Sequence, residues 1–517
     1  MLPASYSLII WIVCSNFLPC KVRGMEYYVA AVYEHHVFLN PNSTALSDRN
    51  SALEFMSKNL DIYEKQVKTA AKKGAQIIVF PEDGIHGFNY TRQSIYPYLD
   101  YVPPPHLLPW NPCLEPHKFP DTEVLQRLSC MAEEGRMYLI ANLGTKMPCQ
   151  PLIAQCPSDG RFQFNTNVVF DDKGTLVATY FKQNLYFEFG FDTPHEVQHV
   201  VFDTPFANKF ALFTCFDILF HEPTVSLVEK YKVKHVLYPT AWMNQLPLLS
   251  AIQIQRGFAT AFNINVLAAN IHHTTLGMTG SGIFSPSTSS YHYDMTNEHG
   301  TLIIAKVPVE PSEDASSYHD DQNLLLNIEM GPTILLNELQ HSQVCEKDER
   351  SVLCKSSVTT KQMPTSFFYS EMMYDNFTFT PLTSSEGIAE VCAGTLCCFL
   401  NYRKAILSDE FYALGVFDGL HTVHGTYSLQ ICALVKCGGL EPQTCGHEVT
   451  DAESVIQFEL RGNFTTRHIF PLLLTSGVTL QLPDSWGWKS NYCYMNASNV
   501  SSGLVTAALY GRYYDRD

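Results

Sequence analysis

Residues 76–82 read QIIVFPE, an uninterrupted apolar run that ends in a proline and a carboxylate. A short run without polar alternation is typical of a strand that is covered on both faces. The stretch before it, 51–74, repeats apolar side chains at helical spacing, opens on the capping-box pattern Ser51–Glu54 and stops at Gly74. Residues 27–33 (YYVAAVY) have a second buried-strand pattern. The order strand, helix, strand predicts a layered α/β unit.

The same alternation continues toward the C-terminus. Further strands and helices separated by turn residues indicate one α/β domain, which we place at residues 25–330. The expected elements are a helix near 122–134, a strand over 137–144, a hairpin over 165–181, a strand over 209–214, a helix over 223–232, and strands over 235–239 and 265–270.

The last third of the chain has a different composition. It contains cysteines at short spacings and short β-type runs such as HTVHGTYSLQICALVKC. We therefore expect a smaller, β-rich domain tied by disulfides over residues 331–517, joined to the first by an acidic, polar connection near 310–340.

The N-terminus carries the features of a secreted protein. The apolar stretch 7–19 is too short to cross a bilayer and suits the core of a signal peptide, which we place at residues 1–24, although it lacks a basic start. The C-terminal residues lack the apolar tail of a lipid-anchored protein, so we expect a released protein without a membrane anchor. Sequons for N-glycosylation agree with secretion; they lie at Asn42, Asn89, Asn376, Asn463, Asn496 and Asn499.

Composition excludes two classes of protein. A hydrophobic content of 46% is too high for a disordered chain, and a net charge of −17 is the wrong sign for nucleic-acid binding. Removing the signal peptide leaves fourteen of the 16 cysteines, most in local groups that favour disulfides. If Cys215 is a free thiol, thirteen remain, so at least one other lacks a partner; our candidate is Cys493.

Three polar residues follow apolar strands: Glu82, Lys182 in VATYFKQNLY, and Cys215 in ALFTCFDILF. In α/β sheets the ligand crevice lies beyond the carboxyl ends of the strands, so these three can converge. A cysteine serves as nucleophile, a carboxylate accepts its proton, and an ammonium stabilises an oxyanion. Together they predict amide hydrolysis through a thioester. Taken singly, each residue has a plainer interpretation as packing or solvated surface.

No pattern predicts a metal or a cofactor. The pairs His35–His36 and His272–His273 alternate across a strand, and no metalloprotease motif is present. The Gly-rich stretch 277–282 and the residues 238–244 beyond a strand are candidates for pocket walls, with ordinary packing as the alternative.

The ordered set Glu82, Lys182, Cys215 resembles the nitrilase (carbon–nitrogen hydrolase) superfamily. Longer stretches resemble its biotinidase and vanin branch over the whole mature chain. They are AAVYEHHV, FPEDGIHGFN, RFQFNTNVVF, FTCFDILF, PTAWMNQLPLLSAI, MTGSG, ALGVFDGLHTVHGTY and LVTAALYGR. This resemblance implies an αββα sandwich with Cys215 as nucleophile, Glu82 as proton acceptor and Lys182 as oxyanion stabiliser or proton donor. It further implies the backbone N–H of Phe216 at the oxyanion and Glu188 as an auxiliary carboxylate.

Within the branch, EYYVAAVYEHH, HVLYPTAWMNQLPLL and the blunt end RYYDRD are more similar to the biotin-amide hydrolases. The resemblance then implies cleavage of small biotinyl amides, namely biocytin and biotinyl peptides, with biotinyl transfer to an amine as a side route. Two alternatives stay open: a pantetheine hydrolase with the same chemistry, and a binding glycoprotein without catalysis. The intact Glu, Lys and Cys argue against the last.

Overall fold

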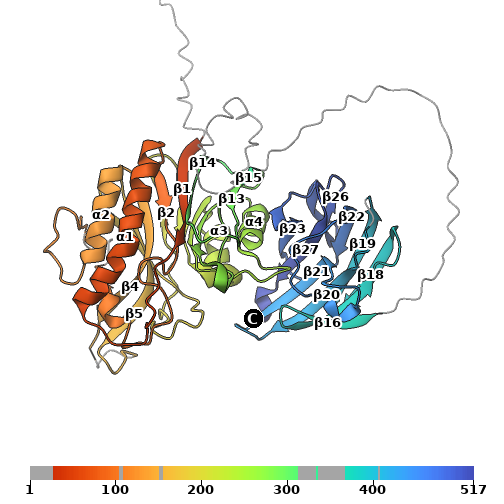
Figure 1. Ribbon diagram of the computed structural model, residues 1–517, viewed down its shortest axis with the longest axis horizontal. Helices are drawn as coiled ribbons and strands as arrows, with labels where there is room; N and C mark the ends of the chain where they lie inside the picture. Colours follow the sequence, from red (N-terminus) through yellow and green to blue (C-terminus); the bar gives the residue numbers. More distant parts are fainter. Residues whose placement is uncertain (1–26, 104–108, 151–154, 312–333, 336–366, 406–407) are drawn as a thin grey trace, which may run out of the picture.

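The structure is a computed structural model that describes residues 27–103, 109–150, 155–311, 334–335, 367–405 and 408–517. The expected signal peptide, the connection beyond 311, and the cysteine group Cys345 and Cys354 lie outside the described residues. Figure 1 shows a layered body joined to a second body made of strands.

The first layer of strands is an eight-stranded sheet in the order β11-β1-β2-β4-β5-β6, with β14 pairing β1 and β3 pairing β4. β1 pairs β2 in parallel, and β2 pairs β4 in parallel, as the strand–helix–strand pattern predicts. β5 and β6 form the expected antiparallel hairpin. The bounds are β1 Tyr27–His36, β2 Ile77–Val79, β3 Asp100–Tyr101, β4 Tyr138–Pro148, β5 Arg161–Phe170, β6 Leu176–Phe181, β11 Ile271–His272 and β14 Thr301–Pro308.

The second layer of strands is a seven-stranded sheet in the order β15-β13-β12-β10-β9-β8-β7. Its buried centre, β8, β9 and β10, is parallel. The bounds are β7 Val201–Phe202, β8 Phe210–Leu212, β9 His235–Pro239, β10 Asn265–Ala269, β12 Ser281–Phe284, β13 Ser289–His292 and β15 Ile334–Leu335.

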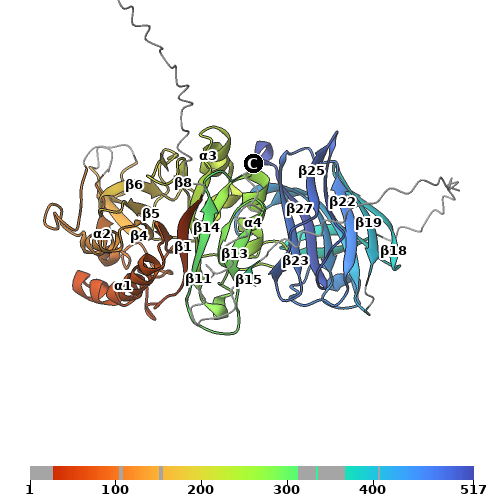
Figure 2. The ribbon, with the colours of Figure 1, turned by 90° about the horizontal axis from the view of Figure 1, so that it is seen from above.

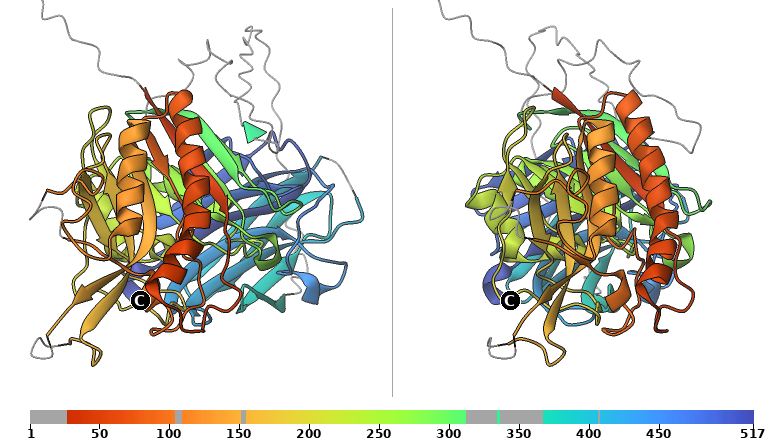
Figure 3. Two further views of the ribbon diagram at one scale, coloured as in Figure 1. Left: turned by 60° about the vertical axis from the view of Figure 1, so that its left-hand side comes forward. Right: turned by 90° about the vertical axis from the view of Figure 1, so that its left-hand side faces the viewer.

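Helices cover the outer faces of the two sheets, which completes an αββα sandwich (Figures 1 and 2). α1 (Arg49–Lys72) and α2 (Glu123–Gly135) lie side by side outside the first sheet, as both views in Figure 3 show. α3 (Ser226–Glu229) and α4 (Ala251–Phe262) lie on the side of the second sheet. The helix expected over 223–232 is a shorter α3 that follows a helical turn over His221–Val225.

The start of α1 differs from the expected capping box. The cap is Asp48, whose carboxylate accepts a hydrogen bond from the backbone N–H of Ser51 at 2.9 Å, and the helix begins at Arg49. The Ser51–Glu54 pattern therefore lies inside the helix, and that prediction is wrong.

The second body is a sandwich of two antiparallel sheets, in agreement with the β-rich prediction. One has the order β16-β17-β20-β21-β27-β23-β24, the other β18-β19-β22-β26-β25. The bounds are β16 Phe368–Met372, β17 Asp375–Pro381, β18 Glu386–Ala393, β19 Leu396–Lys404, β20 Tyr412–His421, β21 Tyr427–Lys436, β22 Ile456–Gly462, β23 His468–Thr475, β24 Thr479–Leu480, β25 Ser485–Lys489, β26 Tyr492–Ala497 and β27 Leu504–Arg512.

This sandwich packs directly on the outer face of α4. A Cβ atom on Gly257 would lie 2.7 Å from Leu472 of β23, and the ring of Phe258 lies 5.9 Å from that of Phe470. The buried core of the second sheet therefore continues into the first sheet of the β-sandwich without a solvent layer. The described part of the chain contains no helix that is long and apolar enough to cross a membrane.

Candidate active site

Glu82 and Lys182 meet beyond the ends of two strands of the first sheet. Glu82 follows β2 and Lys182 follows β6, and both side chains are buried. The ammonium of Lys182 donates to Oε1 of Glu82 at 2.6 Å. The other oxygen of Glu82, Oε2, accepts from the backbone N–H of Ala241 at 3.0 Å. The two residues that the sequence placed at strand ends thus form one buried ion pair.

Glu188 completes a triangle with them. Its carboxylate accepts a hydrogen bond from Lys182, and it shares a second donor with Glu82. That donor is the amide of Asn165 on β5, which lies 2.8 Å from Glu82 and 2.9 Å from Glu188. The two carboxylates would repel each other in a buried site. The ammonium of Lys182 and the amide of Asn165 therefore hold them together.

Cys215 begins a tight turn, Cys215–Leu219, directly after β8. Its φ of +44° is a left-handed conformation that few residues other than glycine adopt without strain. The turn is held by Asp217, whose carboxylate accepts from Tyr180 at 2.7 Å and from the backbone N–H of Asn184 at 2.9 Å. Tyr238 donates to the carbonyl of Cys215 at 2.7 Å. The strained position is therefore fixed from several sides.

Burial dominates the electrostatics of these groups. Burial and the charge of Glu82 raise the pKa of the Cys215 thiol well above its ordinary value, so the resting thiol is protonated. Burial alone would lower the pKa of Lys182, but the charges of Glu188 and Glu82 raise it well above the ordinary value. Burial also raises the pKa of Glu188. The site thus holds a permanent cation beside a neutral thiol.

A network of asparagines connects the two sides of the site, and sequence reasoning missed it. Asn142 on β4 donates to Asn165 at 2.6 Å and to Asn167 at 2.9 Å. Asn167 donates in turn to Thr214 at 2.9 Å, the residue before Cys215. The signal was present in the sequence: Asn165 and Asn167 alternate within an apolar strand, so they face the same side.

A cavity of about 390 Å³ opens beside these groups. Glu82, Lys182, Glu188 and Cys215 all line it, and most of its other walls are apolar. A much smaller cavity of about 50 Å³ shares Cys215 with it. The larger volume lies in the range that proteins use to hold small molecules, about 300–1,000 Å³. The walls include Met278, Ala241 and Met243, which come from the two segments that the sequence analysis named as candidates for pocket walls.

Asp83 is a third carboxyl group in the lining of this cavity, beside Glu82 and Glu188. Its side chain is buried and accepts no hydrogen bond from the described residues within the ordinary range; His86 lies 3.9 Å away. Burial, with the charges of Glu82 and Glu188, raises its pKa well above the ordinary value. These surroundings favour the protonated form of Asp83, and a protonated carboxyl group can donate a hydrogen bond into the cavity.

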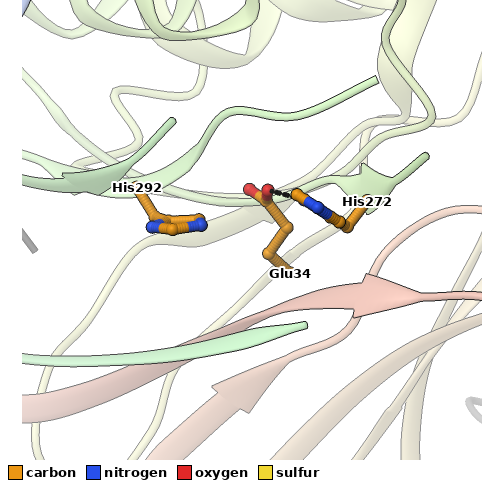
Figure 4. A group of neighbouring side chains, drawn as sticks. All are labelled: Glu34, His272 and His292. Carbon is orange, nitrogen blue, oxygen red and sulfur yellow. Dashed lines mark hydrogen bonds and ion pairs between the residues drawn. The ribbon is translucent and has the colours of Figure 1, made fainter. Parts of the chain in front are cut away.

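A separate buried cluster, Glu34, His272 and His292, has the residue types of a metal site (Figure 4). The carboxylate of Glu34 already accepts from His272 at 2.7 Å, from Thr279 at 2.6 Å and from the backbone N–H of Gly280 at 3.0 Å. His272 also donates to the backbone carbonyl of Asn297. Burial alone would lower the pKa of His272, but the hydrogen bond to Glu34 and the one to this carbonyl raise it. We interpret Glu34 and His272 as a buried ion pair. Through Thr279 and Gly280 it holds the segment that follows Met278 against β1.

Disulfides form among the described cysteines, as the sequence led us to expect, but the spacing left the pairing open, and Cys398–Cys432 joins two separate groups. The pairs are Cys113–Cys130, Cys149–Cys156, Cys392–Cys397, Cys398–Cys432 and Cys437–Cys445. Cys215 and Cys493 are the free thiols of the described chain, and both are buried. The side chains of the predicted glycosylation sites are exposed, except that Asn496 is partly buried and accepts a hydrogen bond from Ser485.

Two families match the sequence. Residues 49–279 match the carbon-nitrogen hydrolase family, and residues 366–517 match the Vanin C-terminal domain. Among solved structures, an amidase from Nesterenkonia sp. is similar with a TM-score of 0.37 and 19% identity, over 58% of this chain and 97% of that chain. Similarity at that level says nothing about the site.

Curated relatives match over nearly the full length. A biotinidase from Bos taurus is 59% identical over 96% of this chain and 94% of its own. A biotinidase from Homo sapiens is 58% identical over 95% of this chain and 90% of its own. A pantetheinase from Bos taurus is 42% identical over 97% of this chain and 92% of its own.

Proposed function

This chain belongs to the carbon–nitrogen hydrolase superfamily, in the branch that contains the biotinidases and the vanins, and from that premise we propose that it hydrolyses biotinyl amides. The observation that carries the choice of substrate is the higher identity to biotinidases, 58–59% against 42% for a pantetheinase of similar coverage. The substrates are biocytin and biotinyl peptides, and the products are biotin and lysine or a lysyl peptide. No cofactor is needed for this chemistry.

The first half of the proposed reaction forms a thioester at Cys215. Glu82 takes the thiol proton as sulfur attacks the amide carbonyl, because the resting thiol is protonated. Lys182 and the backbone N–H of Phe216 stabilise the negative charge on the carbonyl oxygen. The tetrahedral intermediate then breaks its C–N bond, and the departing amine takes the proton from Glu82.

The second half returns the enzyme to its starting state. Water attacks the thioester carbonyl while Glu82 accepts one of its protons, the C–S bond breaks, and the thiolate leaving group takes that proton back. If an amine attacks instead of water, the biotinyl group passes to that amine. Glu188 and Asn165 keep Lys182 and Glu82 in place through both halves.

We further propose that the protein is secreted. Five disulfides in the described chain require an oxidising compartment to form. Exposed sequons at Asn42, Asn89, Asn376, Asn463 and Asn499 are accessible for glycosylation. The signal peptide over residues 1–24 rests on the sequence pattern.

A pantetheinase is the second candidate, because the same triad and the same C-terminal family occur in that part of the branch. A binding glycoprotein without catalysis is the third. The contacts among Glu82, Lys182 and Glu188 disfavour it, because a buried charged cluster is costly to keep without a catalytic use.

The test compares wild-type protein with Cys215→Ala and with Cys493→Ala, the other free thiol, as matched control. Each is given biocytin and pantetheine in parallel. We expect biotin release by wild type and by Cys493→Ala, and none by Cys215→Ala. Release of cysteamine but not biotin would replace the substrate and keep the mechanism. Turnover by Cys215→Ala would remove the mechanism.

A further inference from the structure

The second domain forms part of the opening to the cavity. β20 and β21 are joined by a turn at residues 422–426, and His424 in this turn lines both the large and the small cavity that meet at Cys215. Val423 and Tyr427 line the small cavity as well. The catalytic domain alone would therefore leave the nucleophile more open on this side.

The turn is fixed against the residue that follows the nucleophile. Gly425 has a φ of +142°, and a Cβ atom there would lie 2.6 Å from the ring of Phe216. Only glycine permits this approach without displacing the ring. Arg512 of the same domain is buried and donates to the carbonyl of Leu219, at the end of the Cys215 turn, at 2.6 Å. The two domains therefore share one rigid frame at the site.

Exposed aromatic side chains lie beside the part of the large cavity's wall that Phe187 and His424 form. Phe187, Phe189 and Tyr374 are 59%, 80% and 48% exposed. The ring of His424 lies 5.6 Å from Phe187 and 5.0 Å from Tyr374, and the rings of Phe187 and Phe189 lie 6.3 Å apart. We call these four residues the aromatic rim. A contiguous group of exposed aromatic side chains indicates a binding surface, because proteins seldom leave such groups in contact with water.

The chemistry decides what occupies this rim. The acyl group must occupy the cavity of about 390 Å³, because the neighbouring cavity of about 50 Å³ is too small for it. Once the carbonyl is at Cys215, a peptide on the amine side of the scissile bond has to extend out through the opening. Its nearest side chains then lie against the rim.

We propose that the aromatic rim is the leaving-group subsite, and that it favours peptides with large apolar side chains next to the acylated lysine. This proposal rests on the amide hydrolysis proposed above and adds which part of the substrate the second domain selects. Aromatic side chains would pack against Phe187, Phe189 and Tyr374, whereas glycine neighbours would leave the rim in water. His424 would contact the peptide at the boundary between the two domains.

The kinetic test uses two biotinyl-lysyl peptides, flanked on both sides by phenylalanine or by glycine. The variants are His424→Asn and Phe189→Ala. Asparagine is chosen because it tolerates the left-handed backbone of residue 424, whose φ is +61°. The control is His447→Ala, because His447 is exposed elsewhere in the same domain. In wild type we expect KM to be about 5- to 10-fold lower for the phenylalanine peptide, a difference of about 1 kcal/mol. The ratio should approach one in both variants and stay unchanged in the control. Equal KM values in wild type, or equal loss of kcat for both peptides in the variants, would overturn the proposal.

A binding test separates this proposal from the choice of acyl group. The same two lysyl peptides without biotin are titrated by calorimetry into two proteins. One is the single variant Cys215→Ala, and the other is the double variant Cys215→Ala, His424→Asn. Tighter binding of the phenylalanine peptide, lost with His424→Asn, supports the rim even if biocytin is not hydrolysed. Equal binding of both peptides refutes the rim even if biotin release is confirmed.

Discussion

Replacing Lys182 by methionine tests the buried cluster more directly than any other single change. Methionine keeps most of the volume of the stem and removes the ammonium. The variant loses the 2.6 Å hydrogen bond to Glu82 and the bond to Glu188. Both carboxylates stay buried without a cation, and the amide of Asn165 is the donor that they still share. Removing one partner of a buried charge pair costs about 3–5 kcal/mol. Since domains are stable by about 5–15 kcal/mol, the variant should fold but unfold at lower urea concentration.

The pH dependence of this loss has a defined sign. Without the ammonium, the pKa of Glu188 in the folded protein rises further above its unfolded value. A carboxyl group with a raised folded pKa is tolerated while it is protonated and becomes destabilising as the pH rises through that pKa. The stability difference between wild type and variant should therefore be smallest near pH 4 to 5 and grow toward neutral pH.

Activity gives the second measurement. If Lys182 stabilises the oxyanion, kcat for biocytin should fall about 100- to 1,000-fold with little change in KM, because the interaction acts in the transition state. The control is Lys173→Met, an exposed lysine in the β5–β6 turn, which should change stability by less than about 0.5 kcal/mol. A loss confined to KM would refute the oxyanion role. A stability loss that is constant from pH 4 to 8 would refute the electrostatic reasoning.

Three further predictions concern groups outside the triad. Folding raises the pKa of His272, so the stabilisation that His272→Gln removes should be complete below about pH 6.5 and fade as the pH rises through the folded pKa. Urea unfolding of wild type and variant from pH 5.5 to 9 measures this difference. A difference in stability that is constant with pH would argue against the ion pair with Glu34. Burial raises the pKa of Cys493 to about 12, so iodoacetamide should label it only after unfolding, as followed by mass spectrometry, and rapid labelling of the native protein would contradict its burial. Replacing Cys398 and Cys432 together by alanine opens a 34-residue loop and should lower the free energy of unfolding by about 3–4 kcal/mol; an unchanged unfolding midpoint would show that this disulfide constrains nothing.

The sequence located the chemistry because strand ends are local features. Apolar runs in the sequence predict buried strands. Glu82 and Lys182 each lie just beyond the end of such a strand. The N-cap of α1 was mistaken because Asp48 and Ser51 are both good caps, differing by much less than the roughly 1 kcal/mol that a cap contributes. Tertiary packing settles a difference that small.

The aromatic rim could not be predicted, because its members come from separate parts of the chain. Phe187 follows β6, Tyr374 lies between β16 and β17, and His424 lies between β20 and β21. No periodicity or spacing connects these positions. Their proximity follows from the packing of β23 on α4, which depends on the shapes of many core side chains together.

The resting state of Cys215 explains how a nucleophilic thiol survives among disulfides. A thiolate attacks disulfides and oxidants, so a low-pKa cysteine beside Lys182 would be open to exchange with exposed disulfides or small thiols. Here burial and Glu82 keep the thiol protonated, despite the nearby ammonium. The nucleophile is then generated only when Glu82 removes the proton during attack on a bound carbonyl. Lys182 therefore contributes chiefly once negative charge has moved to the substrate oxygen, which is why its loss should appear in kcat and not in the reactivity of the free enzyme toward thiol reagents.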